Sequence, residues 1–370
     1  MDKICEINEC TACRACMNIC PVNAIYMSED RMERECAVID EEKCIGCDAC
    51  VKTCPNNRET NFHIPLKCFA MRTKEDRIKE VCSSGGIAST IGKYMVLNGG
   101  VYFGAKGFPV CIDACTNEKE VLECSGSKYT ESSTGNSYSE VKKYLLSDKN
   151  IVYVGTPCQC AGLLTYLGKD YDNLITIDLV CHGVPPKSYF QQYIKKMNAT
   201  SVSFRSENKF QIKVKDDHGT LWISDSYHDP YYNLFLKGVI FRENCYNCKY
   251  AKKERVADFT IGDFWGLDKA TLENVYDGNI SLCLVNTQKG LKLFEDIKHL
   301  FVWEERKVEE AIQGNAQLQY ASKTDETLRL QFEKECKRKG SRYAIMHSGF
   351  GKRARRYAIK SQIKSFLKVK

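Results

Sequence analysis

The sequence predicts an α/β protein: a small N-terminal α+β module, a larger mixed α/β domain and a basic C-terminal helix. Three observations support this. A cysteine motif occurs twice before residue 56, a strand–helix–strand pattern follows residue 150, and residues 341–370 carry nine Lys or Arg and no Asp or Glu. The length of 370 residues corresponds to about two or three domains. We expect the small module at 1–72, the two parts of the larger domain at 73–150 and 151–335, and the tail at 336–370.

The composition excludes several classes of protein. The hydrophobic fraction of 43% and the charged fraction of 27% are typical of a soluble globular protein. Since the sequence has no run of 18 apolar residues, we expect no membrane-spanning helix. The first residues lack the apolar segment of a secretion signal, so the 22 cysteines indicate a reducing, cytoplasmic setting.

The first element is the motif C-x-x-C-x-x-C-x-x-x-C-P, which recurs at an offset of 34 residues. The spacing resembles that of bacterial ferredoxins with two [4Fe–4S] clusters, in which the fourth cysteine of each run binds the other cluster. Disulfides would suit a short secreted chain, and zinc prefers more widely separated C-x-x-C pairs. By the ferredoxin rule, the ligands are Cys10, Cys13, Cys16 and Cys54 for one cluster, and Cys44, Cys47, Cys50 and Cys20 for the other.

Short strands are expected at 24–27 and 36–39, and a polar linker at 56–67. The Ser-Ser-Gly-Gly run at 83–86 precedes an apolar-periodic helix from Ile87, and 101–105 reads as a strand. Small residues at a helix start let backbone N–H groups approach a phosphate, although a capped turn would have the same sequence. The stretch 126–129 offers Lys128 for a phosphate and Tyr129 for stacking, or is simply a loop.

The segment after residue 150 reads as a parallel strand–helix–strand unit, with strands at 151–155 and 175–180 and a helix opening at Ala161. Ligands of such sheets bind at the carboxyl edge, where Cys158 and Cys181 are expected. Antiparallel strands follow at 201–204, 210–215 and 221–224, then a helix near 231–239. Further strands are expected at 257–261 and 281–285, and helices up to residue 340.

Four further cysteines stand at turns or strand ends: Cys158, Cys181, Cys245 and Cys248. Two adjacent loops plus a C-x-x-C pair can supply the ligands of a third [4Fe–4S] cluster. Zinc could use the same four thiolates, and buried free cysteine is the third alternative. Cys160 could replace Cys158 as a ligand.

Several motifs, in order, resemble the beta-subunit family of coenzyme F420-reducing hydrogenases and dehydrogenases. They are Val154–Gln159, Cys181–Pro185, Cys245-x-x-Cys248 and Ile261–Gly266, together with Ser83–Gly86 and Ser127–Tyr129 upstream. The resemblance covers about residues 75–320. It implies an α/β domain that holds non-covalent FAD and is fed by an iron–sulfur cluster bound by the same four cysteines. The flavin pocket it implies includes Ser84, Gly85, Gly86, Ser127, Lys128 and Tyr129.

Within this family, some members reduce the deazaflavin coenzyme and one reduces a chlorophyll derivative. Many bacterial members have no assigned substrate, and some are similar to proteins encoded with surface-polysaccharide genes. A flavin can collect two single electrons and deliver a hydride, which thiolate clusters alone do not do. His182, beside Cys181, could relay a proton or donate a hydrogen bond to a cluster sulfur.

The tail places Ile359, Ile363, Phe366 and Leu367 on one helical stripe among basic residues. Such a helix suits an anionic membrane surface at the inner face of the membrane, or an acidic partner; a solvated terminal helix is the alternative. Nucleic acid is not expected, because no stacking aromatics are interleaved with the basic residues.

The sequence therefore predicts an iron–sulfur flavoprotein oxidoreductase. It would take electrons from a ferredoxin-type donor, pass them through [4Fe–4S] clusters to FAD, and reduce an unidentified acceptor. The alternatives are a non-catalytic electron-transfer subunit of a larger complex, and an accessory redox protein of surface-polysaccharide biosynthesis.

Overall fold

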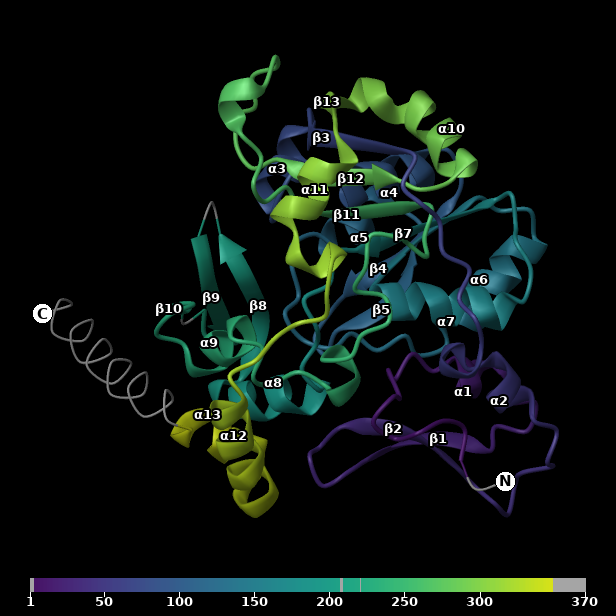
Figure 1. Cartoon of the computed structure of the whole chain (residues 1–370), viewed down its shortest axis with the longest axis vertical. Coiled ribbons are helices and arrows are strands. Elements are labelled where there is room, and N and C mark those ends of the chain that lie inside the picture. Colours follow the sequence, from purple (N-terminus) through teal and green to yellow (C-terminus); the bar gives the residue numbers. More distant parts are fainter. Residues whose placement is uncertain (1–2, 207–208, 220, 349–370) are drawn as a thin grey trace, which may run out of the picture.

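The structure is a computed structural model that describes residues 3–206, 209–219 and 221–348. A small N-terminal module lies below a large sheet with helices on both faces, and a three-stranded sheet lies to one side (Figure 1). The predicted mixed α/β fold class is confirmed.

The N-terminal module consists of one hairpin and two short helices. Strand β1 (Ile25–Glu29) pairs antiparallel with β2 (Glu35–Ile39), as predicted. The third cysteine of each motif copy lies in a helix, Cys16 in α1 (Ala15–Ile19) and Cys50 in α2 (Ala49–Thr53). Each helix ends at the fourth cysteine, which adopts an extended backbone before its proline. Both helices face the large domain (Figure 1).

The large sheet has eight strands. Their order is β13 (Phe301–Arg306), β3 (Lys67–Thr73), β12 (Ser281–Val285), β11 (Phe259–Asp263), β7 (Leu174–Leu179), β6 (Ile151–Gly155), β4 (Val101–Lys106) and β5 (Cys111–Cys115). The inner strands β11, β7, β6 and β4 run parallel, and the flanking strands pair antiparallel. The carboxyl ends of β6 and β7 therefore lie side by side, as the strand–helix–strand pattern predicted.

Alternate residues of each strand face opposite sides of the sheet, and helices cover both sides. One face packs against α4 (Ile87–Leu97), α5 (Glu118–Glu123) and α10 (Gln288–Ile297), with α3 (Asp76–Val81) nearby. The other face packs against α6 (Ser137–Leu146), α7 (Pro157–Leu167) and α11 (Val308–Gly314). Helix α7 also contacts α1, so it joins the core of the sheet to the N-terminal module.

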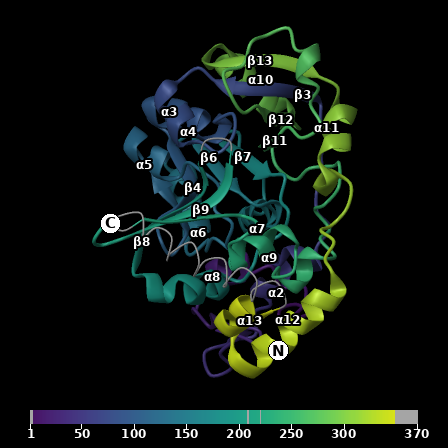
Figure 2. The same cartoon turned by 90° about the vertical axis from the view of Figure 1, so that its left-hand side faces the viewer.

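The lateral unit is built on the antiparallel strands β8 (Ala199–Ser206), β9 (Lys209–Asp216) and β10 (Leu221–Asp225), as predicted. An aromatic-rich core joins it to α8 (Lys187–Ile194), α9 (Pro230–Leu236), α12 (Glu326–Lys339) and α13 (Ser341–His347). Helices α12 and α13 lie together at the same end of the molecule as the N-terminal module (Figure 2). Short 3-10 turns occur at Pro55–Asn57, Lys195–Met197, Glu243–Cys245, Lys269–Thr271, Lys298–Leu300 and Ala316–Leu318.

Two expected boundaries are wrong. The module does not extend to residue 72, because β3 pairs with β12 and β13 inside the large sheet. The apolar run from Cys68 to Met71 is the signal for this strand. The tail does not begin at residue 336, which lies inside α12. Its predicted apolar stripe at 359–367 lies outside the described residues.

Helix α7 begins at Pro157, four residues before the expected Ala161. Thr156 and Gln159 form a capping box at its start, and proline suits the first helical position. Cys158 therefore lies on the first turn of a helix rather than in a loop. None of the helices in the described ranges is long and apolar enough to cross a membrane.

Candidate functional site

A cavity of about 350 Å³ lies between α1, the β-hairpin and the chain around Cys54. Its lining includes Cys10, Cys13 and Cys16 of the first motif copy, together with Cys54 of the second. These are the four residues predicted to bind the first cluster, and the structure brings them together. We call this cavity the inner site.

A second cavity of about 330 Å³ is lined by Cys44, Cys47 and Cys50 of the second motif copy, together with Cys20 of the first. The fourth cysteine thus crosses over in both cavities. We call this second cavity the outer site, because Cys47 and Ile45 on its rim are exposed to solvent.

The inner site is held against the large domain through Cys13. Thr134 donates its hydroxyl hydrogen to the Cys13 carbonyl at 2.8 Å. A Cβ atom on Gly162 of α7 would lie 3.0 Å from the Cys13 sulfur and 2.8 Å from the Tyr138 hydroxyl, so glycine is what allows this close approach. Burial raises the pKa of the Cys13 thiol to about 12, so an ionised thiolate at this position requires a cationic partner such as a metal.

Two more cysteines lie beside the inner site and were not predicted as ligands. Cys5 lines the same cavity. Cys36, which was expected to contribute to packing, is buried and directs its thiol toward the Ile7 carbonyl at 3.8 Å. Cys5 stands outside the repeated motif, so spacing gave no signal for it.

The third cysteine group comes from three parts of the fold. Cys158 lies on the first turn of α7, Cys181 follows β7, and Cys245 and Cys248 lie in the segment between α9 and β11. All four thiols interact electrostatically with one another, so the structure brings them together as predicted. Burial raises the pKa values of Cys158 and Cys245 to about 12.

In the described part of the chain, no three His, Cys, Asp or Glu side chains converge closely enough to hold a single metal ion. A cubane is larger than one ion, and each of its thiolates binds a different iron. The four-thiol sets and the cavities of the inner and outer sites therefore fit [4Fe–4S] clusters by their donor chemistry.

Arg255 fixes the C-x-x-C segment to the sheet. Its guanidinium pairs with Asp178 of β7 at 3.0 Å, and both side chains are almost completely buried. The same guanidinium donates to the carbonyls of Tyr250 and Lys252, which follow Cys248. Cys160 is not in a position equivalent to Cys158, because its thiol donates to the Ile177 carbonyl at 3.6 Å within the core.

The predicted flavin residues lie mainly in two loops that contact each other. The backbone N–H of Ser127 donates to the Ser83 hydroxyl at 2.7 Å. The Ser84 hydroxyl donates to the Ile280 carbonyl at 3.3 Å. Gly85 packs tightly against the backbone of neighbouring strands and Gly86 against side chains, so both glycines are explained by packing within the protein.

The Lys128 ammonium donates to the carbonyls of Cys124, Ser125 and Gly126 at 2.6 to 3.1 Å. Its three N–H bonds are thus committed to the end of α5, and burial lowers its pKa to about 8. Tyr129 stacks on Phe235 in the lateral core. As placed, these two side chains do not present a phosphate cradle.

His182 is exposed beside Cys181, and its carbonyl accepts a hydrogen bond from the Ser322 hydroxyl. Packed atoms around the imidazole lower its pKa, and the nearby Asp263 carboxylate opposes that shift. Asp263 pairs with the buried Arg205 at 2.7 Å. Sequence reasoning missed this ion pair because its two residues come from different sheets.

A module that gathers two sets of four cysteines, docked on an α/β domain with a third set, defines an iron–sulfur redox protein of the electron-transfer type. Comparison with protein-family models agrees. Residues 9–57 match the 4Fe-4S dicluster domain, and residues 148–311 match the C terminus of the beta subunit of coenzyme F420 hydrogenase/dehydrogenase. The chain therefore joins a dicluster module to a domain of the F420 hydrogenase/dehydrogenase beta-subunit family, as the sequence motifs predicted.

A comparison with curated proteins gives no match. Among solved structures, a chain of the F420-reducing [NiFe] hydrogenase complex from Methanosarcina barkeri is similar, with 14% identity and a TM-score of 0.45. The similarity covers 74% of this chain and 95% of that chain. We base no functional conclusion on it.

Proposed function

We propose that the chain is an oxidoreductase that carries single electrons from a ferredoxin-type donor through three [4Fe–4S] clusters toward bound FAD and an acceptor. The ligands would be the four cysteines of the inner site, the four of the outer site, and Cys158, Cys181, Cys245 and Cys248. The observation that carries this proposal is the crossing of the fourth cysteine between the two cavities, which reproduces a dicluster ligand set in space.

The path from the inner site to the third cysteine group is short and buried. The aromatic rings of Tyr138 and Tyr250 each interact with both Cys13 and Cys158. These two cysteines belong to the inner site and to the third group. Gly162, on the same helix as Cys158, contacts Cys13. The proposal therefore needs no domain movement to connect the two clusters.

The flavin is the less supported part of the proposal. When bound, FAD would convert single electrons into hydride chemistry. The two contacting loops at 82–86 and 124–129 are the proposed location, with Ser84, Gly85, Gly86, Ser127, Lys128 and Tyr129 as its residues. His182 is proposed as a proton relay beside the third cluster or as a donor to one of its sulfurs.

One observation favours the alternative of a one-electron subunit without its own catalysis. The Lys128 ammonium, the residue best suited to meet a phosphate, is already satisfied by three backbone carbonyls. In that case, a partner enzyme would hold the two-electron chemistry. The motifs of a beta subunit are compatible with such a partner.

The deciding experiment is anaerobic purification followed by iron, acid-labile sulfide and acid-released flavin analysis. We expect about twelve iron atoms per chain, as three cubanes require, and FAD near one per chain. Eight iron atoms would refute the third cluster. Absence of flavin, even after incubation with FAD, would establish the one-electron subunit.

The role of the basic tail is a separate proposal. Residues 350–370 lie outside the described part of the chain, and the membrane-surface role rests on their sequence alone. We expect the full chain to sediment with anionic liposomes and a chain lacking residues 350–370 to remain in solution. Equal sedimentation of the two would refute membrane binding by the tail, and with it the envelope-accessory role that depends on it.

A further inference from the structure

A buried arginine lies between the inner site and the third cysteine group. Arg242 is 2% exposed, and its Nη2 donates to the carbonyls of Cys10 at 3.0 Å and Glu35 at 2.7 Å, both in the N-terminal module. Its charge also acts on Cys158 and Cys245 of the third group. One guanidinium therefore faces two sets of predicted cluster ligands.

The Nε atom of Arg242 is buried and has no hydrogen-bond partner among the described residues. A buried N–H without an acceptor is costly and calls for an explanation. Inorganic sulfide and thiolate sulfur are acceptors, and both would be present in this region when the proposed clusters are bound. The unpartnered N–H is therefore an independent indication that the site is completed by a sulfur-rich group.

Arg242 belongs to a network of ion pairs at the module interface. Its Nη1 pairs with Glu131 at 2.9 Å, while Glu35 pairs with both Arg14 and Lys187. Three cations and two carboxylates leave a net charge of 3 − 2 = +1. Most of these side chains are nearly excluded from water, so this charge is poorly screened.

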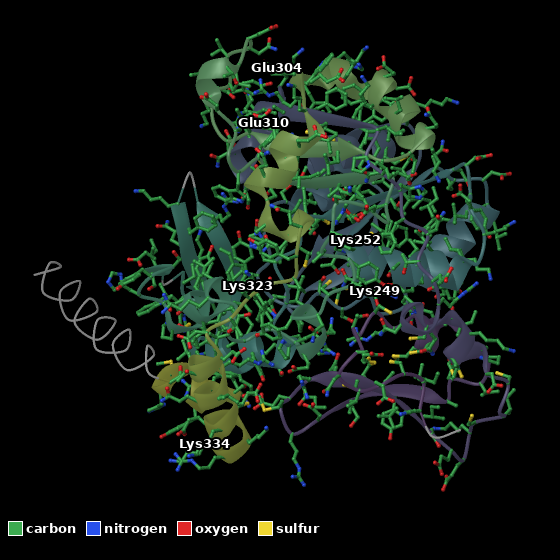
Figure 3. All side chains as sticks on the ribbon, in the orientation of Figure 1. Lys249, Lys252, Glu304, Glu310, Lys323 and Lys334 are labelled. Atoms are coloured by element: carbon green, nitrogen blue, oxygen red, sulfur yellow. The ribbon has the colours of Figure 1, made fainter. Side chains whose placement is uncertain are left out.

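A second cation lies near the same pair of sites. Lys249 donates to the Pro55 carbonyl, next to Cys54 of the inner site, and also interacts with Cys13 and Cys248. Figure 3 shows Lys249 just above the N-terminal module. The inner site and the third group thus share two positive side chains.

The outer site has different surroundings. Its rim residue Ile45 is 64% exposed, and the adjacent Lys43 is paired with Asp40 at the surface, where water screens both charges. A [4Fe–4S] cluster with four thiolates is negative and becomes more so on reduction. A nearby buried cation favours the reduced form, and the reduction potential rises with it.

We infer that Arg242, supported by Lys249, raises the reduction potentials of the inner and third clusters above that of the outer cluster, so that electrons enter at the outer site and move inward. The inference rests on the proposed function. In each step one electron leaves the reduced outer cluster and reduces the inner cluster, and no proton or bond is exchanged. Arg242 is suited to this role because its charge persists at every physiological pH.

The test is a redox titration of the anaerobic full chain, followed by electron paramagnetic resonance, for wild type and two opposing variants. Arg242→Gln lowers the network charge from +1 to 0 and should shift two midpoint potentials to more negative values. Glu131→Gln should shift the same two to more positive values. The outer signal, identified by its absence in Cys47→Ser, should not move in either variant.

Arg306→Gln is the matched control, because its partner Glu310 lies at the opposite end of the molecule from the N-terminal module (Figure 3). We expect it to leave all midpoints unchanged. Lys249→Met provides a second route to a negative shift if Arg242→Gln does not fold. A structural role alone would change cluster content and not produce shifts of opposite sign.

Three results would overturn the inference: unchanged potentials in variants that retain every cluster, equal shifts at all sites, or an outer cluster with the highest potential. Iron content separates this failure from that of the proposed function. Eight iron atoms in the wild type would refute the third cluster, while the shift of the inner cluster alone would still decide the role of Arg242.

Discussion

The inner and outer sites use the same cysteine spacing but have very different surroundings. The inner site is closed by α7, where Gly162 contacts Cys13, whereas the outer site presents Cys47 and Ile45 to solvent. Spacing along the chain thus determines which thiols gather. The residues packed around them determine whether a bound cluster communicates with the rest of the protein or with a visiting partner.

The strongest way to break this comparison is to remove one ligand from each site. Cys13→Ser and Cys47→Ser should each lose one cluster, about four iron atoms per chain. Only Cys13→Ser should also leave the third cluster without electrons when a ferredoxin-type protein is the donor and dithionite is absent. Iron analysis and paramagnetic resonance after donor addition would measure both effects. Equal behaviour of the two variants would contradict the distinction between the sites.

Chelation should distinguish the sites in the unmodified protein. An iron chelator added with a mild oxidant should remove the outer cluster first, because susceptibility follows exposure and Cys47 is the exposed ligand. The signal lost first should be the one that is absent in Cys47→Ser. Simultaneous loss of all signals would indicate that the module opens as a whole.

Ion pairs next to the two sites should contribute unequally to stability. Arg14→Met breaks the buried pair with Glu35 and should cost about 3 kcal/mol in the free energy of unfolding. Lys43→Met breaks the exposed pair with Asp40 near the outer site and should cause no measurable change. Anaerobic denaturant titration of both variants checks this. A large loss in Lys43→Met would show that the outer surface is not simply solvated.

A smaller effect is expected from the contact that closes the inner site. Gly162→Ala adds one methyl group against the Cys13 sulfur and the Tyr138 hydroxyl, and overpacking of this kind costs about 1–3 kcal/mol. Thermal unfolding measures the loss. Thr165→Ala, on the same helix, adds no atoms and serves as the control. If Gly162→Ala were neutral, α7 and the module would have to separate easily.

The difference between the regions also explains what the sequence could predict. The cysteine repeat and the parallel strands were readable because their signals are local: a fixed spacing, and apolar runs of strand length bounded by turns. The strand β3 was missed because its apolar run from Cys68 to Met71 follows a polar segment and was not separated from it. The start of α7 could have been found from Thr156, Pro157 and Gln159, which form a helix-start pattern.

The electrostatic part of the site could not be predicted, because it depends on residues distant in sequence. Arg242 meets Glu131 across 111 positions and the Cys10 carbonyl across 232. Likewise, the commitment of Lys128 to the end of α5 depends on how that helix terminates. Residue types suggested a phosphate contact there, and the ligand role of that side chain remains a prediction.

The crossing of the fourth cysteine has a consequence for how the protein matures. Because Cys54 completes the inner site and Cys20 completes the outer site, neither set of four thiols exists until residue 54 has left the ribosome. Closure of the inner site then waits for α7, more than a hundred residues later. Iron–sulfur assembly factors would therefore meet a module whose outer pocket is complete while its inner pocket is still open, and the natural order of loading would be set by the order of synthesis.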